Sequence, residues 1–265
     1  MLQTVVLALV QSAAEFLPVS SSAHLILTPM LFGWRDQGLA ADIALHVGTL
    51  FSVMIYFRAD VAAMISGGVD VLKRRFETPA AALTLKLGVG CLPVFAAGAL
   101  FHSYIEENLR NPTVVAVTAI AGGVLLYAAD RIGKAGKNVA AMTLKDAFWI
   151  GCAQMLALIP GVSRSGITMT AARALGIERG ESARFSMLLS IPTIGAAGTL
   201  GILDILAGGG TAGALSGTMI LTGGLISFAG GVLAIGFLMK WLKTSSFAVF
   251  AIYRVLLGIY LFCIF

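Results

Sequence analysis

Six largely apolar stretches constrain the fold of this chain more than any other feature of its sequence. They lie near residues 42–57, 86–103, 113–129, 184–204, 217–240 and 246–265. A helix needs about 20 apolar residues to cross roughly 30 Å of hydrocarbon, and each stretch reaches or approaches that length. Because 58% of the 265 residues are hydrophobic and only 12% are charged, a water-soluble globule would have too little polar surface. We therefore expect an all-α integral membrane protein with six transmembrane helices.

Two further apolar stretches, 3–33 and 146–172, are interrupted by residues that break helices. The first contains Pro18 followed by the serines at 20–22, and the second contains the run PGVSRS at 160–165. Irregular backbone at membrane depth is tolerated only where protein or a water-filled cavity satisfies its polar groups. We therefore expect two re-entrant helical hairpins here, not two more spans. The N-terminal stretch lacks the basic start of a secretory signal, so we expect it to remain in the mature protein.

Basic residues gather in short segments between the apolar stretches, as in the cytoplasmic loops of membrane proteins. The segments 58–86, 130–145 and 240–245 carry Arg58, Lys73, Arg74, Arg75, Lys86, Arg131, Lys134, Lys137, Lys145, Lys240 and Lys243. The less basic loops 102–112 and 205–216 then face outward, and six spans place both termini on that side. These loops account for the net charge of +5, so we do not expect a nucleic-acid partner.

An internal repeat relates the two halves of the chain. GCLPVFAAGAL at 90–100 and GGLISFAGGVL at 223–233 share six identities in eleven positions, and the two broken stretches lie about 140 residues apart. Residues 1–130 and 146–265 then each hold one hairpin and three spans, and an odd number of spans inverts the second copy. Inverted-repeat membrane proteins build their sites near the midplane from broken helices. We therefore expect a single membrane domain, 1–265, in which the polar hairpin tips meet.

The two expected hairpin tips carry side chains that can hold a phosphate group. They are Gln11, Glu15, Ser20, Ser21, Ser22 and His24 in the first, and Ser163, Arg164, Ser165 and Thr168 in the second. An arginine at membrane depth costs at least about 2.5–3.5 kcal/mol, so Arg164 needs an anion, a carboxylate or a position near water. Its guanidinium offers a planar fork to phosphate oxygens, and the helices that resume after each break direct backbone N–H groups at the same place.

The two broken stretches also carry a family resemblance. QxxxEFLPVSSSAH at 11–24 and PGVSRSGIT at 160–168 resemble the two signatures of the bacterial undecaprenyl-diphosphate phosphatases, also called bacitracin-resistance proteins, and the likeness continues in DIALHVGTL at 42–50 and FSMLLSIPTIGAAG at 185–198. The resemblance implies removal of the terminal phosphate of the C55 isoprenoid diphosphate, which regenerates the lipid carrier of peptidoglycan synthesis and confers bacitracin resistance. It also implies a multi-pass protein of the bacterial cytoplasmic (inner) membrane, with a divalent metal ion, Mg²⁺ or Ca²⁺, and a site reached from the periplasmic side.

Carried over position by position, the resemblance gives each of these residues a role. The catalytic residues are Glu15, Ser21, His24 and Arg164, the phosphate-binding residues are Ser20, Ser22, Ser163, Arg164, Ser165 and Thr168, and the metal ligands are Glu15 and Gln11. Gln11 stands where many members carry a second glutamate, which removes one carboxylate from the expected metal site.

The sequence leaves the attacking group open but favours His24 over Ser21, because a hydroxyl needs a well-placed base. His24 could attack as a nucleophile with Glu15 orienting its ring, or Ser21 could attack with His24 as its base. Direct attack by metal-bound water is the third version. In each version Arg164, the hydroxyls and the metal ion neutralise charge on the transferred phosphoryl group.

Structural roles compete with these functional ones. Ser20 and Ser22 could simply cap the following helix, and Asp42 and His46 could support the cavity or each other. Arg173, Glu178, Arg179, Glu181 and Arg184 are expected to form a solvated connection after the second hairpin.

A transporter or flippase of the polyprenyl phosphate lipid is the alternative function, since inverted repeats and broken helices are also transporter architecture. Glu15 and His24 favour catalysis, because transport needs no nucleophile. The expected partners are the bilayer and the polyprenyl diphosphate lipid, and assembly into a homodimer is left open.

Overall fold

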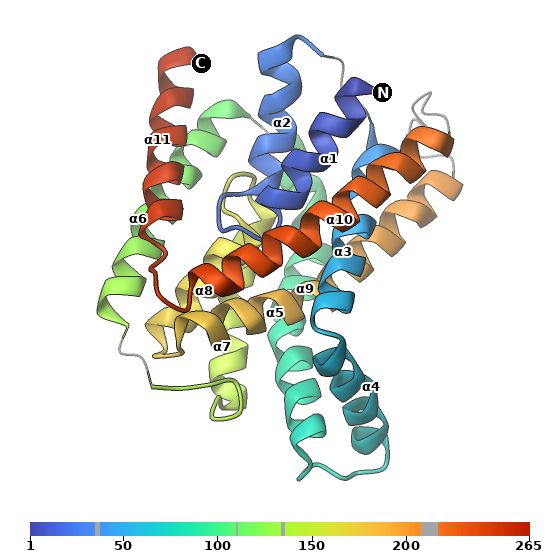
Figure 1. The fold of residues 1–265 in the computed structure, drawn as a ribbon, viewed down its shortest axis with the longest axis vertical. Helices are drawn as coiled ribbons and strands as arrows, with labels where there is room; N and C mark the ends of the chain where they lie inside the picture. Colours follow the sequence, from blue (N-terminus) through green and yellow to red (C-terminus); the bar gives the residue numbers. More distant parts are fainter. Residues whose placement is uncertain (35–37, 110, 134–135, 208–216) are drawn as a thin grey trace.

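The computed structural model describes residues 1–34, 38–109, 111–133, 136–207 and 217–265, and these residues are almost entirely helical (Figure 1). The helices are α1 (Leu2–Ala14), α2 (Ser21–Phe32), α3 (Leu39–Tyr56), α4 (Arg58–Leu72), α5 (Pro79–Asn108), α6 (Pro112–Ile132), α7 (Leu144–Met155), η1 (Leu156–Leu158), α8 (Arg164–Ala174), α9 (Arg179–Leu206), α10 (Gly217–Trp241) and α11 (Ala248–Ile264). Within the described ranges, β pairing is limited to one isolated bridge between Lys137 and Ile177. The expected all-α fold is confirmed.

Four of the described helices are long and apolar enough to cross a membrane: α5 over Pro79–Phe101, α6, α9 and α10. The pair α3 and α4 would make a fifth span, but the chain bends by 89° between them. The last helix, α11, is apolar and has 17 residues. The structure thus has a helix at each of the six expected stretches, and a multi-pass membrane protein with four or five candidate spans is confirmed.

The segment 58–86, expected as a basic loop, is mostly helical. It contains α4 and the start of α5, which pack closely because a Cβ on Gly67 would lie 2.1 Å from the carbonyl oxygen of Ala80. Lys86 is not in a loop either. It lies buried within α5 and its Nζ donates to the carbonyl oxygens of Val139 and Ala140, both at 2.9 Å. The expectation of a loop was wrong here because these carbonyl acceptors allow the ammonium group to be buried.

Each of the two interrupted stretches forms a pair of helices with a break between them, α1 to α2 and α7 to α8, which we call the first and second hairpins. Each second helix begins after a serine with a positive φ, 78° at Ser20 and 69° at Ser163. Each of these serines accepts a hydrogen bond on Oγ from the backbone N–H three residues later, Ala23 N at 3.4 Å and Gly166 N at 3.1 Å. This is N-capping, which offsets part of the roughly 1–3 kcal/mol cost of the backbone conformation. The capping role expected for Ser20 is therefore confirmed.

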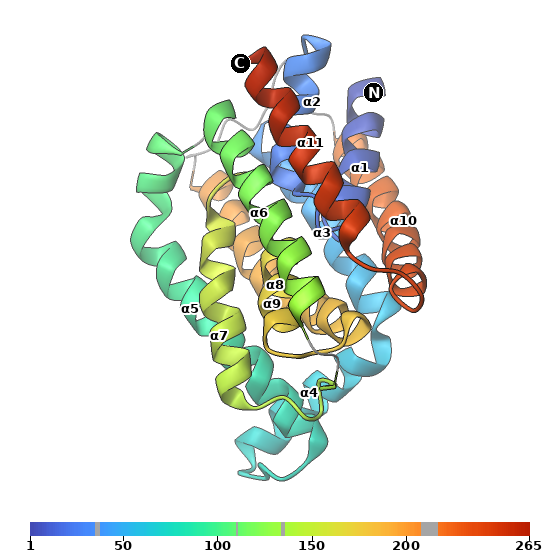
Figure 2. The same ribbon diagram turned by 90° about the vertical axis from the view of Figure 1, so that its left-hand side faces the viewer.

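Each hairpin packs its first helix against a helix of the opposite half. α1 lies along α10, and α7 lies along α5. Two more pairs, α3 with α10 and α6 with α11, also run side by side (Figures 1 and 2). Glycines allow close approach, since a Cβ on Gly151 of α7 would lie 2.4 Å from the carbonyl oxygen of Gly90 on α5. Small residues at such contacts are typical of helix packing in membranes.

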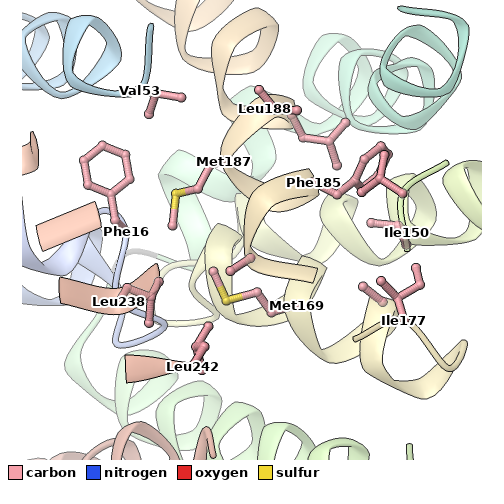
Figure 3. Packing of buried hydrophobic residues seen from close by; sticks show 14 of the residues in the cluster. Phe16, Val53, Ile150, Met169, Ile177, Phe185, Met187, Leu188, Leu238 and Leu242 are labelled. Carbon is pink, nitrogen blue, oxygen red and sulfur yellow. The ribbon is translucent and has the colours of Figure 1, made fainter. Parts of the chain in front are cut away.

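A hydrophobic core lies between the hairpins and the long helices (Figure 3). Phe16 from the first break packs in one cluster with Met169 of α8, Phe185 and Met187 of α9, and Leu238 of α10, all of them fully buried. In lipid such packing stabilises through close van der Waals contact more than through release of water. The core therefore fixes the first break relative to α8 and α9.

The connection after the second hairpin is only in part the solvated segment that we expected: Glu178 is exposed and Arg179 is partly exposed, but Arg173 is buried. Arg173 Nε donates to Asp130 Oδ1 at 3.1 Å, while Arg179 Nε donates to the same oxygen at 2.7 Å. Asp130 Oδ2 accepts from the backbone N–H of Phe247 at 3.1 Å. Asp130 thus links α6, α8, α9 and the residue before α11, and its pairing with Arg173 offsets the cost of burying that charge.

A cavity of about 580 Å³ lies beside this cluster and is lined by Asp130, Arg173 and Arg179 among others. None of the residues at the hairpin tips lines it. Further along α9, Arg184 forms an ion pair with Asp60 of α4, so this basic residue also has a structural partner.

Candidate active site

The tips of the two hairpins meet through an ion pair between Glu15 and Arg164. Glu15 directly follows α1 and Arg164 begins α8, and Arg164 Nη2 donates to Glu15 Oε1 at 2.9 Å. Arg164 Nη1 also donates to the carbonyl oxygen of Ser186 on α9 at 2.8 Å. Glu15 is only 6% exposed. Of the three environments expected for Arg164, the structure shows the carboxylate partner, and the pairing offsets the cost of burying both charges.

The second oxygen of the Glu15 carboxylate is surrounded by polar groups of the first half of the chain. Ser21 Oγ donates to Glu15 Oε2 at 2.7 Å, and Gln11 Nε2 donates to it at 3.2 Å. His46 Nε2 lies 3.7 Å from the same oxygen. Gln11 and Glu15 share a helical face, as their spacing of four residues predicts. A hydroxyl bonded to a carboxylate is a nucleophile beside a general base, and here Ser21 is half-buried at the start of α2.

The other predicted hydroxyl groups divide into accessible and buried ones. Ser22 is exposed, and its Oγ lies 3.3 Å from Ser20 Oγ. The same spacing of 3.3 Å separates Ser163 Oγ from Ser165 Oγ, but both of those residues are buried. Ser165 Oγ donates to the carbonyl oxygen of Leu17 at 3.2 Å and so connects the second tip to the first.

Thr168 lies one turn after Arg164 and is fully buried. Its Oγ1 donates to the carbonyl oxygen of Arg164 at 2.8 Å and lies 2.7 Å from Ser186 Oγ. The carbonyl oxygen of Ser186 also accepts a hydrogen bond from Arg164 Nη1. Thr168 and Ser186 therefore hold the start of α8 against α9, and this contact orients Arg164.

His24 lies on the first turn of α2, but its partners differ from those we expected. Its Nδ1 lies 2.6 Å from the carbonyl oxygen of Ser20, and its Nε2 lies 2.6 Å from the hydroxyl oxygen of Tyr253 on α11. Glu15 is bonded to Ser21 instead of orienting the His24 ring, and the hydrogen-bond acceptor of the Ser21 hydroxyl is Glu15. The geometry thus pairs serine with glutamate, and histidine with tyrosine.

Two residues of this site, Tyr253 and Arg254, were not singled out by sequence reasoning. Arg254 is fully buried, and its Nη2 donates to the carbonyl oxygens of Gly161 at 3.1 Å and Val162 at 2.7 Å, both in the break of the second hairpin. An arginine inside the last apolar stretch is a signal that could have identified it, by the same cost argument that identified Arg164. His46, expected to support the cavity, does lie beside Glu15.

The oxygen atoms around Glu15 fit a hard divalent cation in part. Gln11 Oε1 is buried without a hydrogen-bond partner, while Nε2 of the same amide donates to Glu15 Oε2. Across the described residues, no group of three or more His, Cys, Asp and Glu side chains is arranged to hold a metal ion. A cation at this place would therefore depend on Glu15, Gln11 and the oxygen atoms of a bound phosphate.

Known proteins resemble this chain over nearly its whole length. The undecaprenyl-diphosphatase of Hahella chejuensis is 49% identical over 258 residues, which cover 97% of this chain and 95% of the relative. The enzyme of the same name from Thioalkalivibrio sulfidiphilus is 45% identical over 263 residues, covering 99% and 98%. The family model described as bacitracin resistance protein BacA matches residues 4–260. The chain therefore belongs to the bacitracin resistance protein BacA family.

Proposed function

We propose that this protein hydrolyses undecaprenyl diphosphate to undecaprenyl phosphate and inorganic phosphate. The observation that carries the proposal is the chain of contacts from Arg164 to Glu15 to Ser21, which joins a cation, a carboxylate and a hydroxyl from two hairpins. Relatives named for this activity are 42–49% identical over nearly the whole chain. The reaction would recycle the lipid carrier of peptidoglycan synthesis and underlie the bacitracin resistance after which the family is named.

The contacts favour Ser21 as the attacking group among the three versions left open by the sequence. Ser21 Oγ would form a bond to the terminal phosphorus while its proton passes to Glu15 Oε2, which already accepts that hydrogen bond. The bond from phosphorus to the bridging oxygen breaks, and its electron pair leaves with undecaprenyl phosphate. Water then attacks the phosphorus of the phosphoserine, and the bond from phosphorus to Ser21 Oγ breaks. Glu15 returns its proton to Ser21 Oγ, while the attacking water keeps one proton on the released phosphate and loses the other to solvent. Arg164 stabilises the charge on the equatorial oxygens in both steps.

We also propose that a divalent cation, Mg²⁺ or Ca²⁺, is held by Glu15 and Gln11 together with diphosphate oxygens. The unpartnered oxygen of Gln11, whose amide nitrogen contacts the Glu15 carboxylate, supports this assignment. When bound, the cation would neutralise negative charge on the substrate oxygens.

The proposed membrane arrangement is a pair of inverted repeats, 1–130 and 146–265, with six spans and two re-entrant hairpins. The matching backbone at Ser20 and Ser163 supports it, as does the packing of α1 on α10 and of α7 on α5. In the bacterial cytoplasmic (inner) membrane the basic segments would face the cytoplasm. The polyprenyl lipid would then reach the hairpin tips from the periplasmic side.

Phosphate release from undecaprenyl diphosphate by the detergent-purified protein tests the proposal. We expect release by the unaltered chain, loss of release on addition of a chelator, and loss in Arg164→Ala. Ser66→Ala is a matched control, because Ser66 is exposed on α4 and donates only within its own helix in the contacts recorded for it. Its rate should equal that of the unaltered protein.

A transporter of the lipid is the competing function. If the folded, monodisperse protein binds undecaprenyl diphosphate in an Arg164-dependent manner but releases no phosphate, the phosphatase is excluded and the transporter stands. A trapped phosphoserine at position 21 would support the version of the reaction proposed above, whereas a phosphohistidine at position 24 would overturn it.

A further inference from the structure

A second polar site lies away from the hairpin tips, in the cavity of about 580 Å³ beside Asp130. The ends of α6 and α10, a residue of α8 and the start of α9 enclose it. Four of the side chains that line it are cationic and three are acidic, and none of them takes part in the proposed reaction. The chemistry at the hairpin tips thus leaves this charged cavity without a function.

The buried pair of Asp130 and Arg173 has its hydrogen-bonding groups engaged within the protein. Both carboxylate oxygens of Asp130 accept hydrogen bonds. Arg173 Nη1 donates to the carbonyl oxygen of Ile177 at 2.6 Å, and its Nη2 donates to that of Gly133 at 2.7 Å. This ion pair is therefore neutral and saturated, and it has a structural role.

The other three cations of the cavity have N–H groups to spare. Arg179 Nε donates to Asp130, but within the described residues no acceptor contacts its Nη1 or Nη2. Arg131 Nε donates to the hydroxyl of Tyr127 at 3.2 Å, which leaves its two terminal nitrogens unused in the described part of the chain. Lys243 is exposed, as is Arg131. Because Arg173 already balances the charge of Asp130, all three cations add positive charge to the cavity.

The two remaining acidic residues of the cavity do not cancel this charge. Glu181 Oε2 accepts from the backbone N–H of Val139 at 2.9 Å, and both of its carboxylate oxygens accept from Arg184 Nη1 at 3.3 Å. Glu178 is exposed and is the carboxylate that would oppose an anion here. Three cations from three different elements thus line the cavity with a positive surplus.

The position of the cavity and its apolar residues indicate which kind of anion it fits. Arg131 is in the last turn of α6 and Lys243 follows the end of α10, and both helices are long and apolar enough to cross a membrane. Met239 and Leu242 of the α10 end line the same cavity. A basic pocket with apolar walls at the cytoplasmic ends of spans matches the headgroup and upper acyl chain of an anionic lipid.

We infer that this cavity binds the phosphate group of an anionic phospholipid of the cytoplasmic leaflet. The free N–H groups of Arg131, Arg179 and Lys243 donate to the phosphate oxygens, and Met239 and Leu242 pack against the start of an acyl chain. A free phosphate ion shares the polar contacts but not the apolar ones. The inference does not depend on the proposed phosphatase activity.

Lipid binding to the detergent-purified full-length protein tests the inference, with bound lipid counted by native mass spectrometry. We expect phosphatidylglycerol to bind at least about tenfold more tightly than phosphatidylcholine, because only the former has a net negative headgroup. Inorganic phosphate at the same concentration should not displace it. Equal binding of the two lipids, or displacement by inorganic phosphate, would overturn the inference.

Two double variants locate the site. Arg131→Gln with Lys243→Gln should weaken phosphatidylglycerol binding by about tenfold, and both residues are exposed, so the fold is kept. Lys73→Gln with Arg75→Gln is the matched control, because it removes the same charge from exposed positions after α4 that do not line the cavity. Its affinity should stay within twofold of the unaltered protein. Equal losses in the two double variants would show attraction to surface charge in general and overturn the inference.

Discussion

The first and second hairpins turn at serines with the same backbone conformation, yet they present different chemistry. Ser20, Ser21 and Ser22 of the first correspond to Ser163, Arg164 and Ser165 of the second, and in both the outer two hydroxyl oxygens lie 3.3 Å apart. The middle position is a hydroxyl in one and a guanidinium in the other. Both middle residues donate to the same carboxylate, Glu15.

The two hairpins also differ at the position of Glu15. Its counterpart in the second hairpin, six residues before the middle position, is Leu158. Gln11 and Gln154 correspond as well, but Gln11 Nε2 donates to Glu15 whereas Gln154 Nε2 donates to the carbonyl oxygen of Gly90. The two hairpins thus share one backbone geometry, but the site uses a different residue type at the equivalent positions of each hairpin.

Glu15→Gln should have the largest effect, because it removes the one acidic group that both hairpins share. We expect phosphate release to fall by about a thousandfold, since Ser21 loses its general base and Arg164 loses its counter-charge. The comparison is Glu107→Gln, which alters an exposed glutamate on α5. A rate within tenfold of the unaltered enzyme would show that the carboxylate has no catalytic role.

Ser21→Ala and Ser22→Ala separate the middle position of the first hairpin from its neighbour. We expect Ser21→Ala to lower kcat by about a hundredfold and Ser22→Ala by less than about threefold, because only Ser21 bonds to Glu15 in the contacts described. Steady-state phosphate release measures both. Equal losses would mean that the serines act only as a group of donors to phosphate.

Ser20→Ala and Ser163→Ala test whether the two turns are equivalent in stability. Each substitution removes an N-cap at a positive φ, and each should lower the free energy of unfolding by about 1–2 kcal/mol. Ser20→Gly and Ser163→Gly should lower it less, because glycine tolerates the positive φ. Thermal unfolding in detergent measures the four values. A loss confined to one hairpin would contradict the equivalence of the two backbones.

Gln11→Glu should have the smallest effect and concerns the metal. A second carboxylate beside Glu15 should lower the Mg²⁺ concentration for half-maximal phosphate release by about tenfold. Gln154→Glu is the matched change in the second hairpin, where no acidic residue corresponds to Glu15, and it should leave that concentration unchanged. The same Mg²⁺ dependence in both variants would argue against Gln11 as a ligand.

The breaks at 15–20 and 159–163 could be predicted from sequence, because proline, glycine and serine within apolar stretches leave few alternatives at membrane depth. The meeting of the two hairpin tips was predicted from the inverted repeat, and a carboxylate was one of three environments left open for Arg164. The helices of the six apolar stretches also appear where the hydropathy pattern predicts them. In each of these cases a local sequence pattern, or the large energetic cost of burying a charge or a broken backbone, was sufficient to predict the feature.

Other contacts could not be predicted because they depend on tertiary packing. The 89° bend between α3 and α4 occurs at Phe57, without proline or glycine to mark it. The pairing of Asp130 with two arginines and the contact of Tyr253 with His24 join residues from distant elements. Hydrogen-bond partners of this kind follow from the way in which helices cross, and a single sequence does not specify that geometry.

The long separations within the site have a consequence for its assembly during translation. Arg164 is made 149 positions after Glu15, and Tyr253 is made 229 positions after His24. At about 5–20 residues per second the ribosome needs roughly ten to fifty seconds for such lengths. During that interval the carboxylate and the imidazole of the first hairpin lack the partners that the second half of the chain supplies. Water or the insertion machinery must solvate this tip until the second half of the chain has been inserted.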